Sequence, residues 1–506
     1  MSSSIKKGAI ISYVAIFLNI AITFFYTPWM IKKIGVSDYG LYSLVISFIS
    51  YFIMDFGLHQ AVQRFIAKYR ADGDEDKVAK MVGITTRVYL IIDAVIFVVL
   101  FVLFFFISNI FKGLTPEEIE KLKGLYVIAG TFSVLNFMFK PMAGAMMAYE
   151  YFVEERALEM VNKVGLVLLV CVALYFGAGV YALVLINGAV SLFVSVAKYY
   201  VFRRKSKLKI QWNYFDKSEL KSIFSFSMWT FGSGLAQRLR FSLIPTVLGI
   251  LSNSHEIAVF ALGAQIEGMV FTLSTGINGL FLPKVSRMMK RQEREGVLDL
   301  MIQIGRIQLL LIGLIFCGFV IFGQYFLHLW VGDEFTPTYF VVIFLIITNL
   351  VTLTQHIAVD MIYVENKIKD MTTRLFITSL GGLIIACFLA SSLGAVGCAI
   401  GTGVGLCAYL IWINIYYHGV LGIDIKLFFL RCHLKILPVL VLYSAVAYAV
   451  FMFVDVDSWF KLFLSISLYV LVYFTLCYFF IFNEQEKNLI HVKKRTRQTG
   501  GFIRNK

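Results

Sequence analysis

The feature that most constrains this chain is the recurrence, from end to end, of apolar segments about 20 residues long. An α-helix of that length crosses the hydrocarbon core of a bilayer, because each residue advances it by about 1.5 Å. Fourteen segments can be marked, at positions 8–31, 41–62, 82–110, 124–148, 157–177, 180–202, 223–250, 258–282, 301–325, 338–361, 374–392, 396–417, 434–454 and 458–482. The sequence therefore predicts an all-α polytopic membrane protein with 14 transmembrane helices.

Composition excludes a water-soluble protein. Only 15% of the 506 residues are charged and 59% are hydrophobic, whereas a soluble domain needs about a quarter of its residues charged. The loops between segments are too short to fold as a catalytic domain, so we expect no enzyme and no catalytic residue. The seven cysteines form no CxxC pair and the seven histidines no HExxH motif, so we expect no metal and no cofactor.

The distribution of basic residues predicts the orientation. Loops on the side of the N-terminus, counted with the first residues of the adjoining spans, hold 33 Lys and Arg residues, and those on the opposite side hold only six. By the positive-inside rule both termini are then cytoplasmic. This asymmetry also accounts for the net charge of +15 without nucleic acid as a partner, and the basic run from Lys493 to Arg497 is suited to anionic lipids.

An internal repeat appears when the chain is shifted by about 218 residues. The stretch Asp38 to Tyr42 then falls on Glu256 to Phe260, and Arg87 falls close to Arg306. Six spans separate the copies, so we expect two pseudo-symmetric six-helix lobes in the same orientation, plus two extra helices. The expected divisions are an N-lobe at 1–222, a C-lobe at 223–433, helices 13 and 14 at 434–482, and a basic cytoplasmic tail at 483–506.

Several basic residues lie inside the apolar segments, where each costs about 2.5 to 3.5 kcal/mol unless it has a partner or faces water. Lys140 and Arg238 are the deepest. Gln237 and Arg240 continue a polar stripe in the span of Arg238. The two arginines point about 200° apart around a helix, so only one is expected to face a central cavity, and which one stays open. Lys163 lies nearer a cytoplasmic helix end, where its stem can reach the interface.

Asp55, Asp93, Glu267 and Asp360 are acids that also lie within spans. An intramembrane carboxylate can bind a proton or sodium and couple transport to an ion gradient. Asp93 and Glu267 are the deeper pair and are the predicted ion-coupling residues. The alternative is that these acids pair with the intramembrane arginines and serve folding alone.

Two motifs together with the 6 + 6 + 2 arrangement resemble a known family. The stretch Lys33 to Tyr42 (KIGVSDYGLY) and the turn Leu329 to Phe335 (LWVGDEF) resemble polysaccharide flippases of the Wzx type. These belong to the multidrug/oligosaccharidyl-lipid/polysaccharide (MOP) exporter superfamily. The resemblance implies two lobes around a cationic cavity, and alternating access that carries undecaprenyl-diphosphate-linked oligosaccharide across the bacterial inner membrane for O-antigen, capsule or teichoic acid synthesis. A polymerase and a chain-length regulator of that pathway are the implied protein partners.

The predicted substrate-binding residues are the polar side chains that can meet a diphosphate: Arg87, Lys140, Arg238, Arg240, Arg306 and Gln237. Arg87 and Arg306 are expected at the cytoplasmic entrance of the cavity, on opposite walls. A multidrug exporter of organic cations is disfavoured because such a cavity would repel cations. An integral-membrane glycan polymerase is disfavoured because the outer loops are short, and a structural scaffold would not need buried charge.

Overall fold

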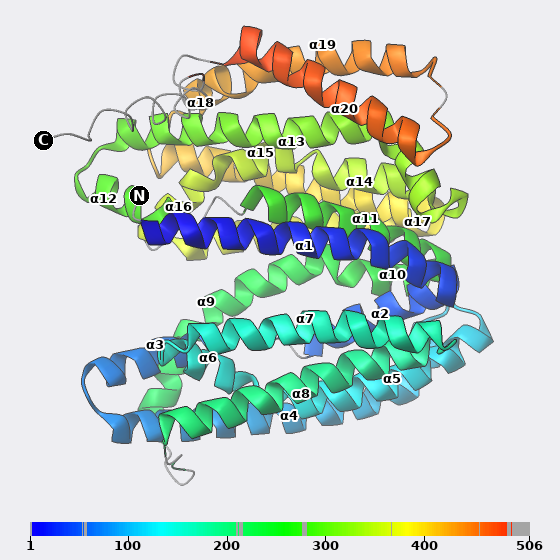
Figure 1. Ribbon diagram of the computed structural model, residues 1–506. Coiled ribbons are helices and arrows are strands. Elements are labelled where there is room, and N and C mark those ends of the chain that lie inside the picture. The colour runs from blue at the N-terminus through cyan, green and yellow to red at the C-terminus, as the bar shows by residue number, and fades with distance from the viewer. Residues whose placement is uncertain are drawn as a thin grey trace, which may run out of the picture. The chain divides into compact units, whose positions relative to one another are not determined.

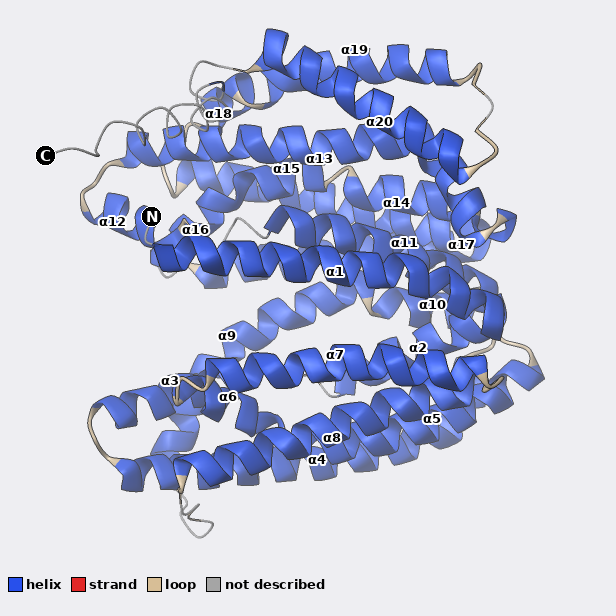
Figure 2. Ribbon diagram, viewed as in Figure 1, coloured by secondary structure: helices blue, strands red, loops and turns tan. Residues whose placement is uncertain are grey.

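The computed structural model describes residues 3–52, 54, 58–208, 211, 216–275, 281–365, 367–454, 456–482 and 487. These residues form helices joined by short turns, with no strand in the described ranges (Figure 2). The elements are α1 (Ser3–Ile34), α2 (Val36–Phe52), α3 (Leu58–Ala71), α4 (Glu75–Ile110), α5 (Pro116–Phe137), α6 (Lys140–Ala148), α7 (Phe152–Tyr175), α8 (Val180–Ser206), α9 (Lys217–Phe241), α10 (Leu243–Leu251), α11 (Ser254–Thr275), α12 (Leu282–Lys290), α13 (Arg294–Val331), η2 (Asp333–Phe335), α14 (Thr338–Ile346), α15 (Asn349–Thr352), η3 (Leu353–Gln355), α16 (His356–Val364), α17 (Ile368–Gly419), α18 (Ile425–Arg431), α19 (His433–Phe451), α20 (Trp459–Leu476) and the π-helical turn η4 (Cys477–Ile481).

Ten helical segments in the described ranges are long and apolar enough to span a membrane: Glu75–Ile110, Pro116–Ala148, Phe152–Tyr175, Val180–Ser206, Ser254–Thr275, Arg294–Val331, Asp333–Val364, Ile368–Gly419, Ile425–Phe451 and Trp459–Ile481. The segment Ile368–Gly419 covers two of the expected spans, because its backbone breaks at Gly394. The expected spans at 8–31, 41–62 and 223–250 fall on α1, on α2 with α3, and on α9 with α10. The all-helical, polytopic class is confirmed, and the count of fourteen is not.

The chain forms two compact units. The first comprises Met1–Met269, Phe340–Leu345 and Glu365–Ile413. Within it α5 packs against α4 and α8, and α7 packs along α8 (Figure 1). Tyr89 of α4 and Phe137 of α5 are fully buried, with their ring centroids 5.3 Å apart. The second helix α2 packs on both α5 and α10.

The second unit comprises Val270–Tyr339, Ile346–Val364 and Asn414–Lys506. Its longest helix, α13, packs against α19 and α20. Phe322 of α13 lies with its ring centroid 4.8 Å from that of Phe451 and 5.8 Å from that of Tyr469. The Tyr473 hydroxyl donates to the carbonyl oxygen of Leu310 at 2.7 Å, which adds a polar tie between α20 and α13. The expected division into lobes at residues 222 and 433 stays a prediction.

Glycines let the two halves of α17 approach closely. A Cβ added to Gly382 would lie 2.8 Å from the carbonyl oxygen of Gly401 and 3.0 Å from the Cα of Gly405. The chain reverses at Gly394, whose φ of +54° suits glycine. The spacing of Gly397, Gly401 and Gly405 predicts close helix packing, and this prediction is confirmed.

The repeat expected from the sequence has a counterpart in the helices. Arg87 and Arg306 each lie twelve residues after the first residue of their helix, in α4 and α13. These helices are also of similar length, 36 and 38 residues. A shorter helix precedes each of them, α3 and α12. The match between the copies therefore extends to local structure.

Candidate functional site

Arg238 lies in the span expected at 223–250 and has no ion pair or side-chain hydrogen bond within the described ranges. It lies in α9 (Lys217–Phe241), and its side chain is half-buried. In the described part of the chain, no carboxylate and no hydrogen-bond acceptor contacts its guanidinium. The Tyr51 hydroxyl is close enough to interact electrostatically with it. Pairing with Asp93, Glu267 or Asp360, the alternative from the sequence, is not observed. Asp55 lies outside the described residues.

Lys140 follows a short interruption of the helix within the span Pro116–Ala148. α5 ends at Phe137, and α6 begins at Lys140 with Pro141 in its first turn. The Lys140 Nζ lies 5.0 Å from the centroid of the Phe137 ring, within the range of a cation–π interaction. Arg87 is half-buried in α4, between the buried residues Thr86 and Val88. Both residues therefore lie in the first unit, like Arg238.

Arg306 lies in the second unit and is 5% exposed. Its Nη1 donates to the carbonyl oxygen of Arg431 at 3.1 Å, and its Nη2 donates to that of Ile481 at 2.8 Å. The guanidinium thereby links α13 to the end of α18 and to η4. The side chains of Gln237 and Arg240 lie outside the described residues, so which arginine faces a cavity stays open. The assignment of all six residues to substrate binding remains a prediction.

The predicted ion-coupling acids are both buried. Asp93 of α4 is 8% exposed, and its Oδ1 has no hydrogen-bond partner in the described ranges. Glu267 of α11 is 6% exposed. In the second unit, Asp360 is 4% exposed, and its Oδ1 lies 3.8 Å from the His356 Nε2. A buried carboxylate without a partner is costly, so Asp93 is suited to binding a proton or a cation.

A pocket of about 500 Å³ opens in the first unit. Phe241, the last residue of α9, and Ser242, which follows it, line the pocket three and four residues after Arg238, which is not itself in the lining. Three tyrosine rings, seven small polar or amide side chains and one lysine also contribute to its wall: Tyr26, Tyr39, Tyr42, Asn19, Thr23, Thr27, Ser43, Ser47, Ser242, Gln265 and Lys163. Aromatic faces beside hydroxyl and amide groups are suited to an uncharged polar ligand.

Hydrogen bonds fix part of this wall. The Gln265 Nε2 donates to the Thr27 Oγ1 at 2.8 Å, and the Tyr39 hydroxyl donates to the Gln265 Oε1 at 3.3 Å. The Asn187 Nδ2 donates to the Tyr42 hydroxyl oxygen at 3.2 Å. These bonds join α1, α2, α8 and α11, so the polar groups of the pocket are held by helices that are distant in the sequence.

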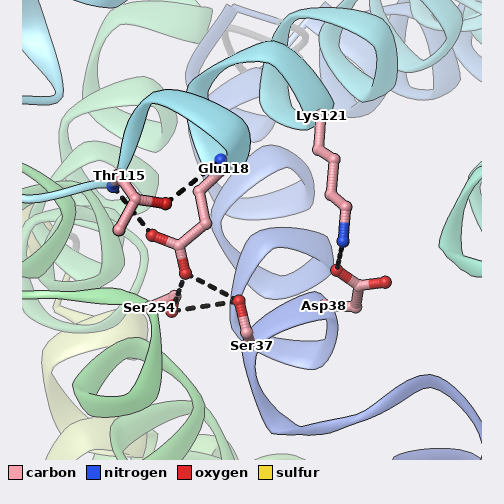
Figure 3. Close-up of polar contacts among 6 residues, drawn as sticks. All are labelled: Ser37, Asp38, Thr115, Glu118, Lys121 and Ser254. Carbon is pink, nitrogen blue, oxygen red and sulfur yellow. Dashed lines mark hydrogen bonds and ion pairs between the residues drawn. The ribbon is translucent and has the colours of Figure 1, made fainter.

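The motif Lys33 to Tyr42 forms a contact between the two sequence repeats (Figure 3). The Ser37 and Ser254 hydroxyls both donate to the Glu118 Oε1, the first at 2.7 Å, and their oxygens lie 3.2 Å apart. The Glu118 Oε2 accepts the Thr115 backbone N–H at 2.9 Å, which completes a capping box at the start of α5.

The same motif fits a tight backbone approach. A Cβ on Gly40 would lie 2.1 Å from the carbonyl oxygen of Ser254. Asp38 pairs with Lys121, with the Nζ 3.0 Å from the Oδ1 (Figure 3). In the other repeat, the Glu256 carboxylate accepts the backbone N–H of Ala395 at 2.7 Å. The motif is thus explained by packing where α2 and α11 begin.

Sequence reasoning did not identify the pocket lining. Lys163 was expected to extend toward the interface, yet it lines the pocket from α7. Tyr26, Tyr39 and Tyr42 carry no local signal, because tyrosine is common in membrane helices as an interfacial anchor. Tyr39 and Tyr42, three residues apart and so on one side of α2, were the available hint.

The fold defines a polytopic α-helical membrane protein with polar side chains inside its apolar helices. Residues 5–289, more than half of the chain, match the family described as polysaccharide biosynthesis protein. The chain belongs to this family. A relative from Bacillus subtilis (strain 168), named uncharacterized membrane protein EpsK, is 21% identical over 508 residues, with 97% of each chain covered.

Two solved structures share the fold. The lipid II flippase MurJ in its inward closed conformation has a TM-score of 0.71 at 14% identity, covering 93% of this chain and 99% of its own. An inward-facing multidrug resistance MATE family transporter has a TM-score of 0.68 at 13% identity, with 80% and 95% covered. The predicted membership among MOP polysaccharide flippases is confirmed at the level of family and fold.

Proposed function

We propose that this protein is a flippase that moves undecaprenyl-diphosphate-linked oligosaccharide across the bacterial inner membrane by alternating access. The single observation that carries this proposal is Arg238, a half-buried arginine within α9 that has no protein acceptor in the described ranges. A guanidinium in that setting is suited to a phosphate ligand, because phosphate oxygens can accept from its fork of N–H donors. Membership in a family of polysaccharide biosynthesis proteins supports a ligand that takes part in polysaccharide synthesis.

The pocket in the first unit supports a division of the ligand into two parts. The diphosphate would bind Arg238, with Lys140 and Arg87 as further cations. The sugar portion would occupy the pocket of Tyr26, Tyr39 and Tyr42, where hydroxyl groups can exchange hydrogen bonds with Gln265 and the neighbouring hydroxyls. A cavity built for an organic cation would instead need more acid than base, so the phosphate ligand is favoured over a drug.

The charge distribution supports an orientation. With 33 basic residues in or next to loops on the N-terminal side against six on the other, both termini would be cytoplasmic. The Ser37, Glu118 and Ser254 contact would then lie toward the outer face, and release of the glycan would require it to open. A polymerase and a chain-length regulator would act on the delivered glycan.

Arg238→Ala tests the proposal. In a strain lacking the native protein, the variant should reach the membrane at normal levels while lipid-linked oligosaccharide accumulates facing the cytoplasm. Loss of one charged contact to phosphate should weaken binding by about 1.5 to 3 kcal/mol, roughly 10- to 150-fold. Arg238→Lys should retain part of the activity, since the charge stays while the planar fork is lost.

Arg204→Ala is the matched control, because Arg204 is an exposed arginine at the end of α8. It should export normally. Full export by Arg238→Ala at normal protein levels would contradict the proposal, and so would an equal loss in both alanine variants.

A further inference from the structure

A second cavity lies wholly within the second unit. It shares no lining residue with the pocket of Tyr26, Tyr39 and Tyr42. Its volume is about 960 Å³. Five segments contribute to it: α12, the first turns of α13, the end of α18, the start of α19, and η4. We propose that this cavity binds the phosphate headgroup of an anionic lipid.

Cationic side chains give the cavity its character. Lys284, Arg306, Arg431 and Lys435 line it, together with one carboxylate, that of Asp299. Lys284 and Lys435 are exposed, and in the described part of the chain neither makes an ion pair. The ammonium groups are therefore available to a ligand, and phosphate is the anion that such groups commonly bind.

Arg431 is also available despite its acidic neighbour. Its Nη1 lies 3.9 Å from the Asp299 Oδ1, and the two side chains are 55% and 75% exposed. An exposed ion pair at that distance contributes little to stability. The Arg431 side chain can therefore leave Asp299 and bind a phosphate through two hydrogen bonds at small cost. Asp299 also lines the cavity, and its negative charge would limit how many anionic groups can bind there.

Arg306 holds part of the cavity wall in place. Its bonds to the carbonyl oxygens of Arg431 and Ile481 hold together three of the five segments that form the wall. The cavity is thus organised before a ligand arrives, which reduces the cost of binding. Our proposal does not require the Arg306 guanidinium itself to contact the ligand.

The remaining lining explains why the ligand is a lipid and not a free anion. Leu300, Ile302, Phe480 and Ile481 supply apolar surface next to the cations. Phosphate lipids combine the same two properties, and basic pockets between transmembrane helices on the cytoplasmic side bind such headgroups. This lipid site is independent of the proposed transport function, so a test of one does not decide the other.

The first test uses a triple variant, Lys284→Ala with Arg431→Ala and Lys435→Ala, purified full length in a neutral detergent. Phosphatidylglycerol and phosphatidylcholine are titrated separately, with lipid retention followed by native mass spectrometry. The unsubstituted protein should prefer phosphatidylglycerol, and the triple variant should bind it at least about tenfold more weakly, because three nearby cations are lost.

The matched control removes the same number of positive charges from exposed positions on two of the same helices that do not line the cavity. Arg287, Lys290 and Lys426 are exposed in α12 and α18 and do not line it. Arg287→Ala with Lys290→Ala and Lys426→Ala should keep binding within about twofold, since diffuse charge is screened. Equal loss in both triple variants would overturn the proposal, as would equal binding of the two lipids by the unsubstituted protein.

Two further arms identify the source of the headgroup. Undecaprenyl phosphate that displaces phosphatidylglycerol at lower concentration would assign the cavity to the carrier class, and the reverse order would assign it to bulk lipid. If the triple alanine variant does not fold, Lys284→Glu with Lys435→Glu takes its place, because both side chains are exposed. Unchanged phosphatidylglycerol binding by this variant would also overturn the proposal.

Discussion

At the scale of single residues, our proposals rest on buried or half-buried charges that have no protein partner in the described ranges. Lys198 and Glu155 illustrate the folding case, with the Nζ 2.5 Å from the Oε1 and both side chains largely buried. Arg238 and the Oδ1 of Asp93 illustrate the other case, because neither has a hydrogen-bond partner in the described ranges. A lone buried charge costs stability, so its presence needs a ligand or a proton to explain it.

Asp93→Asn tests ion coupling. The amide has nearly the same shape but cannot ionise, so substrate binding should persist while transport loses its dependence on the ion gradient. Removing an unpaired buried carboxylate should leave thermal stability equal or higher. Transport is measured in proteoliposomes with and without an imposed proton or sodium gradient.

Glu267→Gln is the companion variant, since Glu267 is the other predicted coupling residue and is also buried. If one acid carries the driving ion, only its variant should lose the gradient dependence. An unchanged gradient dependence in both variants would assign both carboxylates to folding.

The site was only partly predictable from these residues. Apolar background makes Arg238 and Asp93 conspicuous in a sequence, because charge is rare inside spans. Their lack of partners is set by neighbouring helices, which no local pattern encodes. Lys140 shows the same limit: its expected depth assumes a continuous helix over 124–148, whereas the helix is interrupted between Phe137 and Lys140.

At the scale of elements, helix length and polarity come from the sequence, while helix contacts depend on single small residues. The glycines of α17 are an exception in which the sequence does predict a helix contact, because glycines four residues apart lie on one face and allow close packing. The expected boundaries of the long helices were close: α4, α8 and α13 overlap the spans at 82–110, 180–202 and 301–325. The interrupted spans, such as α5 with α6, were predicted as single helices.

Gly382→Ala and Gly381→Ala make a matched pair in α17. The first Cβ would meet the Gly401 carbonyl oxygen at 2.8 Å, and the second would meet nothing within 4 Å. Gly382→Ala should therefore destabilise the protein by about 1 to 3 kcal/mol through overpacking. Gly381→Ala should be neutral or stabilising by up to about 1 kcal/mol, because alanine favours a helix.

Thermal unfolding in detergent, followed by circular dichroism, compares the two variants at equal protein concentration. A lower midpoint for Gly381→Ala than for Gly382→Ala would contradict close packing between the halves of α17.

At the scale of the whole molecule, the charge bias makes a prediction about topology. Lys205, Asn253 and Thr336 are exposed at helix ends or turns, so cysteines there can be labelled. In intact cells an impermeant maleimide should react with Asn253→Cys and Thr336→Cys. Lys205→Cys should react only after the membrane is opened, because its loop belongs to the basic side. Labelling of Lys205→Cys in intact cells would reverse the proposed orientation.

Alternating access makes the second whole-molecule prediction. The two repeats meet where the Ser37 and Ser254 oxygens lie 3.2 Å apart, with Glu118 accepting from both. A flippase that opens outward must separate these residues, whereas a static scaffold need not. Ser37→Cys with Ser254→Cys should form a disulfide under mild oxidation, because the side chains already approach to within bonding range after a small rotation.

Oxidation of the double cysteine variant should stop export, and reduction should restore it. Each single variant should export normally under both conditions, which separates the effect of the crosslink from that of the substitutions. The crosslink is scored by the shift of the protein on a nonreducing gel, and export by the appearance of glycan at the cell surface. Full export from a completely crosslinked population would show that this contact never opens, and the outer exit would then have to lie elsewhere among the helices.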